Sequence, residues 1–317
     1  MTWTSSFDSD GGNPIDERLT VGSLLREGAE TLRASGSESA RLDAELLLGH
    51  AIRTDRTSLL ARPELPVGAD HARIFNGLVA RRQSGEPVAY IRGLKEFYGL
   101  VFSVDPRALI PRPETELLVE IGIDRLRRLL TERPRLEGSG PIVVWDVATG
   151  SGAVAVALAV ESRRRGYAAD VRFSATDLSA DALALATENA VAHGVADAID
   201  FAVADLAGSA EVMADLLLAN LPYISTAAVP TLPVAASFEP VLALDGGTDG
   251  LDLVRRLIGQ LERAVDDDGT ALLEIGAGQT EGVRAAADAA LPNWELAFHA
   301  DLAGLPRVAE LSRGRAQ

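Results

Sequence analysis

The fold of this chain is decided by residues 142–160, which combine an apolar run, a glycine-containing turn and a helix-prone segment. The run reads Ile142-Val143-Val144-Trp145-Asp146-Val147, and its length and largely apolar character are those of a strand covered on both faces. The turn Ala148-Thr149-Gly150-Ser151-Gly152 follows directly, and the segment Ala153 to Val160 comes next. Strand, turn and helix in this order predict the first unit of an α/β domain.

Further apolar runs repeat this pattern towards the C-terminus. In several places they are separated by alanine-rich helical segments, and they cover Val171 to Thr176, Ile199 to Val203, Leu216 to Ala219 and Ala271 to Ile275. Such alternation predicts a mostly parallel sheet. Two final runs, Trp294 to His299 and Arg307 to Leu311, predict an antiparallel hairpin at the sheet edge. The expected fold class is α/β and Rossmann-like, with a seven-stranded, mostly parallel sheet.

The first third of the chain has a different pattern. Residues 1–17 mix Ser, Asp, Gly and Pro and predict a disordered tail. Residues 18–85 show helical periodicity and predict a small N-terminal helical domain. The apolar positions expected to share a helix face are Leu24, Leu25, Gly28 and Leu32, then Leu42, Leu46 and Leu47, then Ile74, Leu78 and Val79.

A connecting segment is expected over residues 86–113. It contains two short β-like runs, Val88 to Ile91 and Leu100 to Val104, with glycine-bearing turns between them. Near its end Arg112 lies between two prolines, which stiffen the backbone just before an amphipathic helix. We therefore predict a β-hairpin linker over residues 86–113 and a second domain over residues 114–317.

The composition narrows the classes of function. The net charge is −16, whereas proteins that bind nucleic acid usually carry a basic surface, so a nucleic acid is not expected as the direct substrate. A basic protein or a small molecule is an easier partner electrostatically. The chain has no cysteine, which excludes disulfides and thiolate sites, and its four histidines lack the spacing of metal ligands. No metal site is predicted.

The sequence also bears on location. The polar, acidic N-terminus lacks the basic start and apolar core of a signal peptide. No apolar run approaches the roughly 20 residues that span a bilayer. We expect a cytoplasmic protein with no membrane partner.

Three interpretations of the turn at residues 148–152 compete. The first is a turn without a ligand. The second is a dinucleotide site, since Gly150-x-Gly152-x-x-Ala155 fits the G-x-G-x-x-A pattern, and the third is a site for S-adenosylmethionine. A pyrophosphate normally binds at a glycine directly after the strand, where this chain has Asp146 and Ala148. An acid there repels a diphosphate, but it can coordinate a cationic aminocarboxyl group directly or through water. The turn therefore favours S-adenosylmethionine.

Acids after the next two strands extend this candidate site. Asp177 ends the second strand, where a carboxylate can accept both hydroxyls of a ribose. Asp205 and Leu206 follow the third strand and are placed to contact an adenine. The predicted cofactor-binding residues are Asp146, Ala148, Thr149, Gly150, Ser151, Gly152, Asp177, Leu178, Asp205, Leu206 and Asn220.

The tetrapeptide Asn220-Leu221-Pro222-Tyr223 directly follows the apolar run of the fourth strand. It thus lies at the sheet edge where open α/β sheets bind ligands. A planar amide or amine nitrogen has two N–H donors, which the Asn220 side-chain oxygen and the Leu221 carbonyl can accept. This directs the nitrogen lone pair towards a methyl donor, while Tyr223 can stack on the planar group and Pro222 stiffens the turn. These four residues are the predicted catalytic residues.

With these motifs in place, the sequence resembles the HemK/PrmC family, the protein-glutamine N5-methyltransferases that modify the Gly-Gly-Gln motif of peptide-chain release factors. The resemblance begins near Leu19 and covers nearly the whole chain. Besides the turn and the tetrapeptide, it rests on blocks with no obvious chemistry of their own: Gly85 to Gly93, Glu96 to Gly99, Leu109 to Val119, Phe238 to Pro240 and Ala243 to Leu251.

The resemblance implies an S-adenosylmethionine-dependent methyltransferase that acts on release factors, with the N-terminal domain gripping the protein substrate. It places the family's glycine motif on Ala148 to Gly152, its ribose acid on Asp177 and its adenine contact on Asp205 and Leu206. The family's Asn-Pro-Pro-Tyr motif falls on Asn220 to Tyr223, with Leu221 in place of the first proline. Asn-Leu-Pro-Tyr also resembles methyltransferases that act on adenine in ribosomal RNA.

Two alternatives to a release factor substrate therefore stay open. One keeps the methyl transfer to a planar nitrogen but places it on adenine in DNA or RNA, or on a small-molecule metabolite. The other is an α/β domain that binds the cofactor or a partner without catalysis.

Overall fold

The computed structural model describes residues 19–132, 140–208 and 213–313. The chain divides into two compact units, Met1–Arg92 and Gly93–Gln317. The division falls inside the segment expected to be a linker. The tail predicted for residues 1–17 lies outside the described residues.

The first unit is helical, as predicted. Its helices are α1 (Val21–Ala34), α2 (Ala40–Ala51), α3 (Arg56–Ala61), α4 (Ala69–Gln83) and α5 (Val88–Arg92). The predicted face of α1 is confirmed, because Leu24, Leu25, Gly28 and Leu32 are all buried. Gly28 is needed there, since a side chain would meet the ring of Phe75 on α4 at 2.6 Å.

The faces predicted for α2 and α4 are wrong in part. Leu42 is 42% exposed and Ile74 is 50% exposed. The hydrophobic side chains that these two helices bury are Ala40, Ala44, Leu47, Leu48 and Ala51, and Ala72, Phe75 and Val79. A helical period predicts that a segment is a helix. In a short helix with leucines on several sides, however, the period does not determine which face is buried.

The β-like run predicted at Val88 to Ile91 is also wrong. The segment forms α5, and the Ile91 N–H donates to the Pro87 carbonyl at 3.0 Å. A four-residue apolar run does not distinguish strand from helix, and a proline at the start favours a helix. The hairpin of this region is formed instead by β1 (Leu94–Phe97) and β2 (Leu100–Ser103), which pair antiparallel.

The second unit is built on a seven-stranded sheet in the described residues, as predicted. Its strands are β3 (Ile142–Val147), β4 (Val171–Asp177), β5 (Ile199–Val203), β6 (Ala214–Ala219), β7 (Val265–Glu274), β8 (Trp294–Ala300) and β9 (Pro306–Arg313). Strands β3 to β7 pair in parallel, and β9 pairs antiparallel with both β7 and β8. The edge hairpin expected from the last two apolar runs is thus confirmed.

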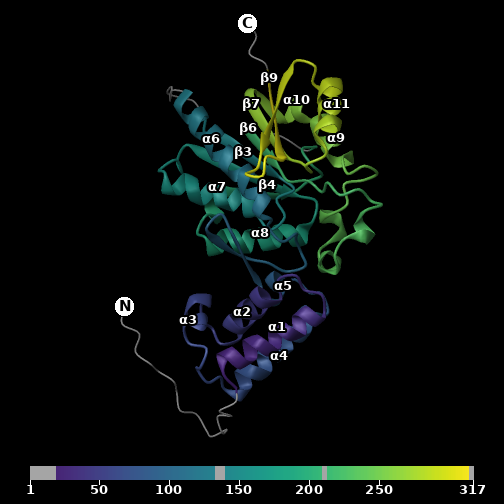
Figure 1. The fold of residues 1–317 in the computed structure, drawn as a ribbon. Helices are drawn as coiled ribbons and strands as arrows, with labels where there is room; N and C mark the ends of the chain where they lie inside the picture. The colour runs from purple at the N-terminus through teal and green to yellow at the C-terminus, as the bar shows by residue number, and fades with distance from the viewer. Residues whose placement is uncertain (1–18, 133–139, 209–212, 314–317) are drawn as a thin grey trace. The chain divides into compact units, whose positions relative to one another are not determined.

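Helices cover both faces of this sheet (Figure 1). Helices α6 (Glu116–Glu132), α7 (Ala153–Arg164) and α8 (Ala180–Ala192) lie on one face, and α9 (Asp252–Ile258), α10 (Leu261–Ala264) and α11 (Thr280–Ala290) on the other. The burial alternates accordingly, since Leu218 packs towards α6 while Leu217 belongs to the core beneath α9 and α10. Short 3-10 helices η1 (Pro113–Thr115), η2 (Ala196–Ala198), η3 (Val229–Thr231), η4 (Val234–Phe238) and η5 (Val241–Ala243) complete the unit.

The strand order β5-β4-β3-β6-β7-β9-β8 determines where a ligand can bind. The chain proceeds from β3 outward through β4 to β5, then crosses to β6 on the other side of β3 and continues outward. Between β3 and β6 the direction of progression reverses. In open α/β sheets ligands bind at such a reversal, beyond the carboxyl ends of the strands.

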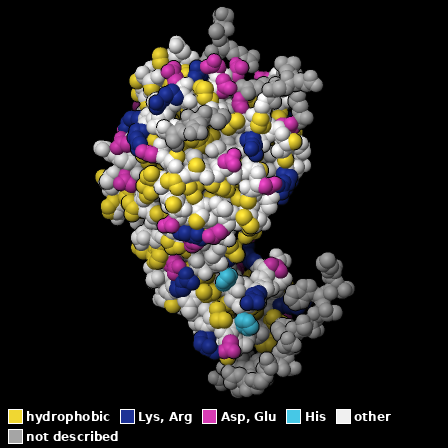
Figure 2. Space-filling model, turned by 180° about the vertical axis from the view of Figure 1, so that it is seen from behind, with side chains coloured by type: hydrophobic (Ala, Val, Ile, Leu, Met, Phe, Trp, Pro, Cys, Tyr) yellow, Lys and Arg dark blue, Asp and Glu magenta, His cyan; other side chains and the backbone are white. Residues whose placement is uncertain are grey.

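The surface carries charges of both signs. On the face that Figure 2 shows, basic and acidic side chains are interspersed with exposed hydrophobic ones. This face is an ordinary mixed surface rather than the basic stripe of a nucleic-acid-binding protein. In the part of the chain that the structure describes, every helix is too short or too polar to cross a membrane.

Candidate active site

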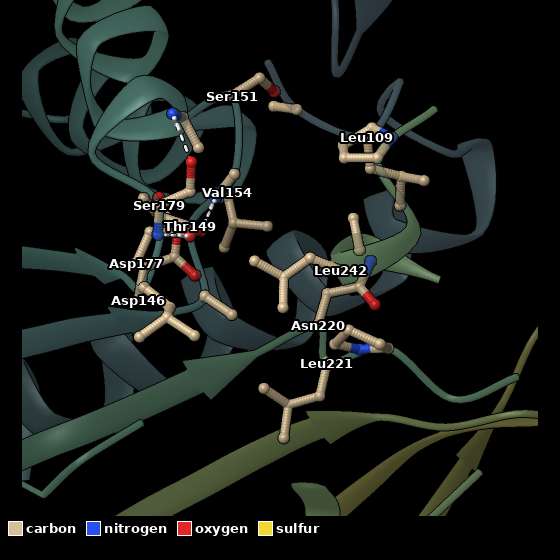
Figure 3. A pocket seen from close by; sticks show the side chains of 18 of the residues that line it. Leu109, Asp146, Thr149, Ser151, Val154, Asp177, Ser179, Asn220, Leu221 and Leu242 are labelled. Atoms are coloured by element: carbon tan, nitrogen blue, oxygen red, sulfur yellow. Dashed lines mark hydrogen bonds between the residues drawn. The ribbon is translucent and has the colours of Figure 1, made fainter. Parts of the chain in front are cut away.

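A cavity of about 230 Å³ lies at the reversal point between β3 and β6. It is lined by most of the predicted site residues: Asp146, Ala148, Thr149, Gly150, Ser151, Asp177, Leu178, Asp205, Leu206, Asn220, Leu221 and Pro222. We call the part formed by Asp146, Asp177 and Asp205 the acidic end, and the part formed by Asn220 to Pro222 with Thr115 and Arg112 the amide end. Figure 3 shows Asp146 and Asp177 close together, with Asn220 and Leu221 apart from them.

The turn after β3 adopts the left-handed backbone conformation at three positions, with φ of +58° at Ala148, +56° at Gly150 and +80° at Gly152. Gly152 does not line the cavity in the described residues, and its role is to admit α8. A side chain at Gly152 would meet the Cβ of Ala186 at 3.0 Å. Ala148 holds a conformation that costs an ordinary residue roughly 1–2 kcal/mol. It is the position where the family pattern has glycine.

Asp146 is 2% exposed and is held by local hydrogen bonds. The Thr149 hydroxyl donates to its Oδ2 at 2.6 Å, and the Ala155 N–H at the start of α7 donates to the same oxygen at 3.1 Å. Burial raises the pKa of Asp146 to about 7, against the opposing effect of these two donors. The negative charge of nearby Asp177 raises the pKa further. A cation at the acidic end would stabilise the ionised form.

Asp177 ends β4 and links the two loops of the acidic end. Its Oδ2 accepts from the Gly150 N–H and its Oδ1 from the Ser179 N–H, both at 2.9 Å. Each carboxylate oxygen has two lone pairs, so both oxygens keep the capacity to accept a ligand hydroxyl. The exposed Leu178 and the buried Leu206 line the cavity nearby.

Asp205 lines the cavity at its exposed rim. Its Oδ2 lies 2.6 Å from Nη2 of Arg256, in an ion pair that sequence reasoning did not foresee. Because Arg256 already binds one oxygen of this carboxylate, Asp205 has less capacity to bind a ligand than the sequence suggested. In the described residues, no group of three or more His, Asp or Glu side chains is placed to hold a metal ion.

Asn220 begins the amide end directly after β6. Its Nδ2 donates to Oγ1 of Thr115 at 3.0 Å, a contact across 105 positions of sequence. Thr115 is 4% exposed and lies at the end of η1. Sequence reasoning missed Thr115, because nothing in the sequence shows that this threonine contacts Asn220.

The tetrapeptide is supported by a glycine-rich segment that sequence reasoning treated as a block without chemistry. A side chain at Gly246 would collide with the Pro222 carbonyl and would meet the Tyr223 Cα at 2.9 Å. The Gly246 N–H also donates to the Ile224 carbonyl at 2.8 Å. From the other side, Nε2 of Gln279 donates to the Tyr223 carbonyl at 2.9 Å.

The Tyr223 side chain is half-buried and does not line the cavity in the described residues. Burial raises its pKa, and the negative charge of Glu274 raises it further. Its stacking on an acceptor stays a prediction.

An ion pair with one buried partner, Glu239, joins two further family blocks at the amide end. Glu239 is 5% exposed, and its Oε1 lies 2.7 Å from Nη2 of Arg112. Its Oε2 accepts from the Ile110 N–H at 3.3 Å. The blocks that the sequence left unexplained therefore fasten the segments on either side of the cavity to each other.

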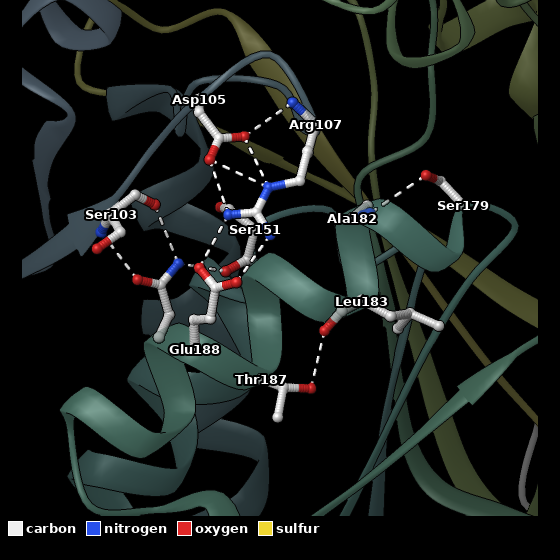
Figure 4. A network of polar contacts seen from close by, with 10 residues as sticks. Ser103, Asp105, Arg107, Ser151, Ser179, Ala182, Leu183, Thr187 and Glu188 are labelled. Atoms are coloured by element: carbon white, nitrogen blue, oxygen red, sulfur yellow. Dashed lines mark hydrogen bonds and ion pairs between the residues drawn. The ribbon is translucent and has the colours of Figure 1, made fainter.

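A polar network attaches the β1–β2 hairpin to the turn after β3 (Figure 4). Nδ2 of the buried Asn189 on α8 donates to the carbonyls of Ser103 and Ser151, at 3.1 and 2.9 Å. Beside it, the guanidinium of Arg107 forms ion pairs with Asp105 and Glu188, each at 2.8 Å. Arg107 lines the cavity, but its positive charge is already paired with these two carboxylates.

Known proteins resemble both parts of this chain. A family model described as the PrmC N-terminal domain matches residues 23–93. The release factor glutamine methyltransferase of Nitratidesulfovibrio vulgaris is 38% identical over 300 residues, which cover 93% of this chain and 96% of that protein. The chain belongs to the release factor glutamine methyltransferase family. The resemblance expected from its motifs is thereby confirmed.

Other relatives agree with this assignment. The release factor glutamine methyltransferase of Moorella thermoacetica is 39% identical over 267 residues, covering 84% of this chain and 89% of that protein. Among solved structures, the hMettl16 catalytic domain has a TM-score of 0.54 at 13% identity and covers 73% of this chain and 82% of that chain. At that identity the likeness shows the fold alone. The α/β, Rossmann-like fold with a mostly parallel sheet, predicted from the alternating strands and helices, is confirmed.

Proposed function

We propose that this chain transfers a methyl group from S-adenosylmethionine to the side-chain nitrogen of a glutamine in a peptide-chain release factor, within its Gly-Gly-Gln motif. The observation that carries the proposal is that Asn220 and the buried Asp146 line one cavity. An amide that binds the acceptor and an acid that binds a cationic methyl donor are thus presented to the same space. The names of the relatives support a release factor as the substrate.

The donor set fits S-adenosylmethionine. This cofactor carries an ammonium and a sulfonium, which the carboxylates of Asp146 and Asp177 attract. The free lone pairs of Asp177 suit the ribose hydroxyls, and Leu178 and Leu206 offer apolar contact to the adenine. When bound, the cofactor supplies an electrophilic methyl group.

The role of the protein at the acceptor is orientation. We infer that Oδ1 of Asn220 and the carbonyl of Leu221 accept the two N–H groups of the glutamine side chain, which directs the nitrogen lone pair at the methyl carbon. The new N–C bond forms as the C–S bond breaks, and the sulfur keeps that electron pair. The nitrogen then loses one proton to solvent, so no strong base is needed. Pro222 stiffens the turn, and Tyr223 packs beside the acceptor.

The helical N-terminal domain, which we place at residues 18–85, is proposed to recognise the protein substrate. A second candidate function is methyl transfer to an adenine or to a metabolite nitrogen. Leu221 favours it, because Asn-Leu-Pro-Tyr resembles adenine methyltransferases. A cytoplasmic location and a role in translation termination belong to the same proposal.

The test is a labelling experiment with the full chain. Purified protein is incubated with radiolabelled S-adenosylmethionine and, separately, unmethylated release factors, DNA, ribosomal RNA and a small-molecule extract. We expect label on a release factor glutamine and a loss of about 100-fold or more in Asn220→Ala, comparable to removing one key polar group from an active site. Asn293→Ala, at an exposed asparagine before the edge strand β8, is the control. Label only on another fraction would overturn the proposed substrate.

A further inference from the structure

A chain of three polar side chains runs from the amide end of the cavity into the protein interior. Asn220 donates from Nδ2 to Oγ1 of Thr115 at 3.0 Å. Thr115 also interacts with the carboxyl of Glu274, the last residue of β7, and lowers its pKa against the rise caused by burial. Thr115 is 4% exposed and Glu274 is 2% exposed, so water does not compete for these contacts.

The donors and acceptors in this chain can be assigned by counting hydrogens. A threonine hydroxyl has one hydrogen to donate. Oε2 of Glu274 is buried without a hydrogen-bond partner in the described part of the chain. A buried carboxylate is costly unless it is hydrogen-bonded, so the Thr115 hydrogen goes to Glu274. The Thr115 oxygen is then an acceptor towards Asn220.

This assignment determines which end of Asn220 faces the cavity. An acceptor at Thr115 requires the NH2 group of Asn220 on that side, and the amide oxygen then points the other way. We propose that Thr115 and Glu274 are positioning residues, which hold Asn220 with its amide oxygen towards the acceptor nitrogen. The inference rests on the proposed function, since it explains how Asn220 is oriented to accept the N–H groups of the substrate.

Protonation of Glu274 would undo this arrangement. A protonated carboxyl can donate to Thr115, whose own hydrogen is then free to bond Oδ1 of Asn220. The amide can therefore turn and present its NH2 group to the substrate amide, where two donors repel each other. The ionised carboxylate is the form that favours methyl transfer.

The surroundings of Glu274 place this change near neutral pH. Burial raises its pKa to about 7, the hydrogen bond from Thr115 opposes the rise, and the negative charge of Glu114 adds to it. The positive charges of Arg307 and Arg112 lower the pKa. The half-buried Tyr223 is another titratable group nearby, and its burial and the charge of Glu274 raise its pKa. With cofactor saturating, kcat is expected to rise with pH through about 7.

The test compares Thr115→Val, Thr115→Ser and Glu274→Gln. All are assayed for kcat on an unmethylated release factor between pH 6 and 8, at saturating cofactor and substrate. We expect Thr115→Val to lower kcat about tenfold or more, while Thr115→Ser, which keeps the hydroxyl, stays within about threefold. Glu274→Gln is expected to lower kcat and to abolish its rise with pH. Cofactor affinity, measured by calorimetry, should be unchanged in all three.

Glu310→Gln is the matched control, because Glu310 is a buried acid on the neighbouring strand β9 whose partners are Arg125 and His299. It should keep the wild-type kcat and its pH dependence. Equal losses in Thr115→Val and Thr115→Ser, or a pH rise that persists in Glu274→Gln, would overturn the inference. Thermal melting shows whether a variant is folded. If Thr115→Val does not fold, the inference is judged from the kcat values and pH profiles of Thr115→Ser and Glu274→Gln. An active Asn220→Ala would instead refute the proposed function.

Discussion

The acidic end and the amide end of the cavity are assembled in different ways. At the acidic end the contacts of Asp146 are close in sequence, since it accepts from Thr149 and Ala155, three and nine positions away. Asp177 reaches Gly150 across 27 positions, between the ends of adjacent strands. At the amide end Asn220 bonds Thr115 across 105 positions. Glu239 bonds Arg112 across 127.

The difference teaches that the two ends depend on different parts of the fold. Around Asp146 and Asp177 the acidic end needs two successive β–α units in register, while Asp205 at its rim pairs with Arg256, 51 positions away. The amide end needs segments before the sheet, after β6 and after β7 to meet at one place. Changes at one end should therefore alter cofactor binding, and changes at the other end should alter the rate of transfer.

The largest expected effect breaks the amide end through its backbone support. Gly246→Ala introduces a side chain against the Pro222 carbonyl and the Tyr223 Cα, which displaces the tetrapeptide. We expect kcat to fall about 100-fold, since small displacements of reacting groups cost that much, while cofactor affinity is kept. Gly278→Ala is the control, because its side chain would meet nothing within 4 Å. A comparable loss of cofactor affinity in Gly246→Ala would show that the two ends are not separable.

A smaller effect is expected at the acidic end. Asp177→Ala removes the carboxylate proposed for the ribose and should weaken cofactor binding by about 1–3 kcal/mol, with little change in kcat at saturation. Calorimetric titration measures the affinity. Asp181→Ala, four positions later in the exposed first turn of α8, should bind as the wild type does. Unchanged affinity in Asp177→Ala would mean that the ribose acid is misassigned.

The two ends should also differ in how they respond to pH. The pKa of Asp146 is about 7 in the ligand-free protein, and a bound cation favours the carboxylate. Below pH 7 binding must release a proton, so cofactor affinity should fall by up to about tenfold per pH unit between pH 7 and 5.5. Asp146→Asn should lose this dependence, whereas Glu274→Gln should keep it. The same slope in both variants would assign the titration to another group.

The smallest effect concerns the backbone at Ala148. Replacing it by glycine relieves the left-handed conformation but increases the freedom of the unfolded chain, so Ala148→Gly should raise the free energy of unfolding by at most about 1 kcal/mol. Denaturant unfolding measures this. Ala184→Gly, at an exposed position inside α8, should change stability in the opposite direction by a similar amount. A destabilised Ala148→Gly would contradict strain at this turn.

Sequence reasoning predicted the sheet well because its strands are carried by local patterns. Five apolar runs, an edge hairpin and the loop after β3 all lie where expected. It failed where local pattern is ambiguous, at the helix formed by Val88 to Ile91 and at the buried faces of α2 and α4. In both cases the secondary structure or the buried face depends on the segment that packs against it, and that segment is distant in sequence.

The sequence by itself determined the α/β fold, the acids at or just after the ends of the first three strands of the sheet and, through the resemblance of its motifs, the methyltransferase family. Each of these follows from residues that are neighbours in the chain or repeat with a regular period. The tertiary structure alone decided which groups hold the tetrapeptide: Thr115 and Glu274 behind Asn220, Gly246 and Gln279 beside Tyr223, and Glu239 with Arg112. The physical reason is that a hydrogen bond depends on distance in space, and more than a hundred positions of sequence separate Thr115 from the asparagine it holds.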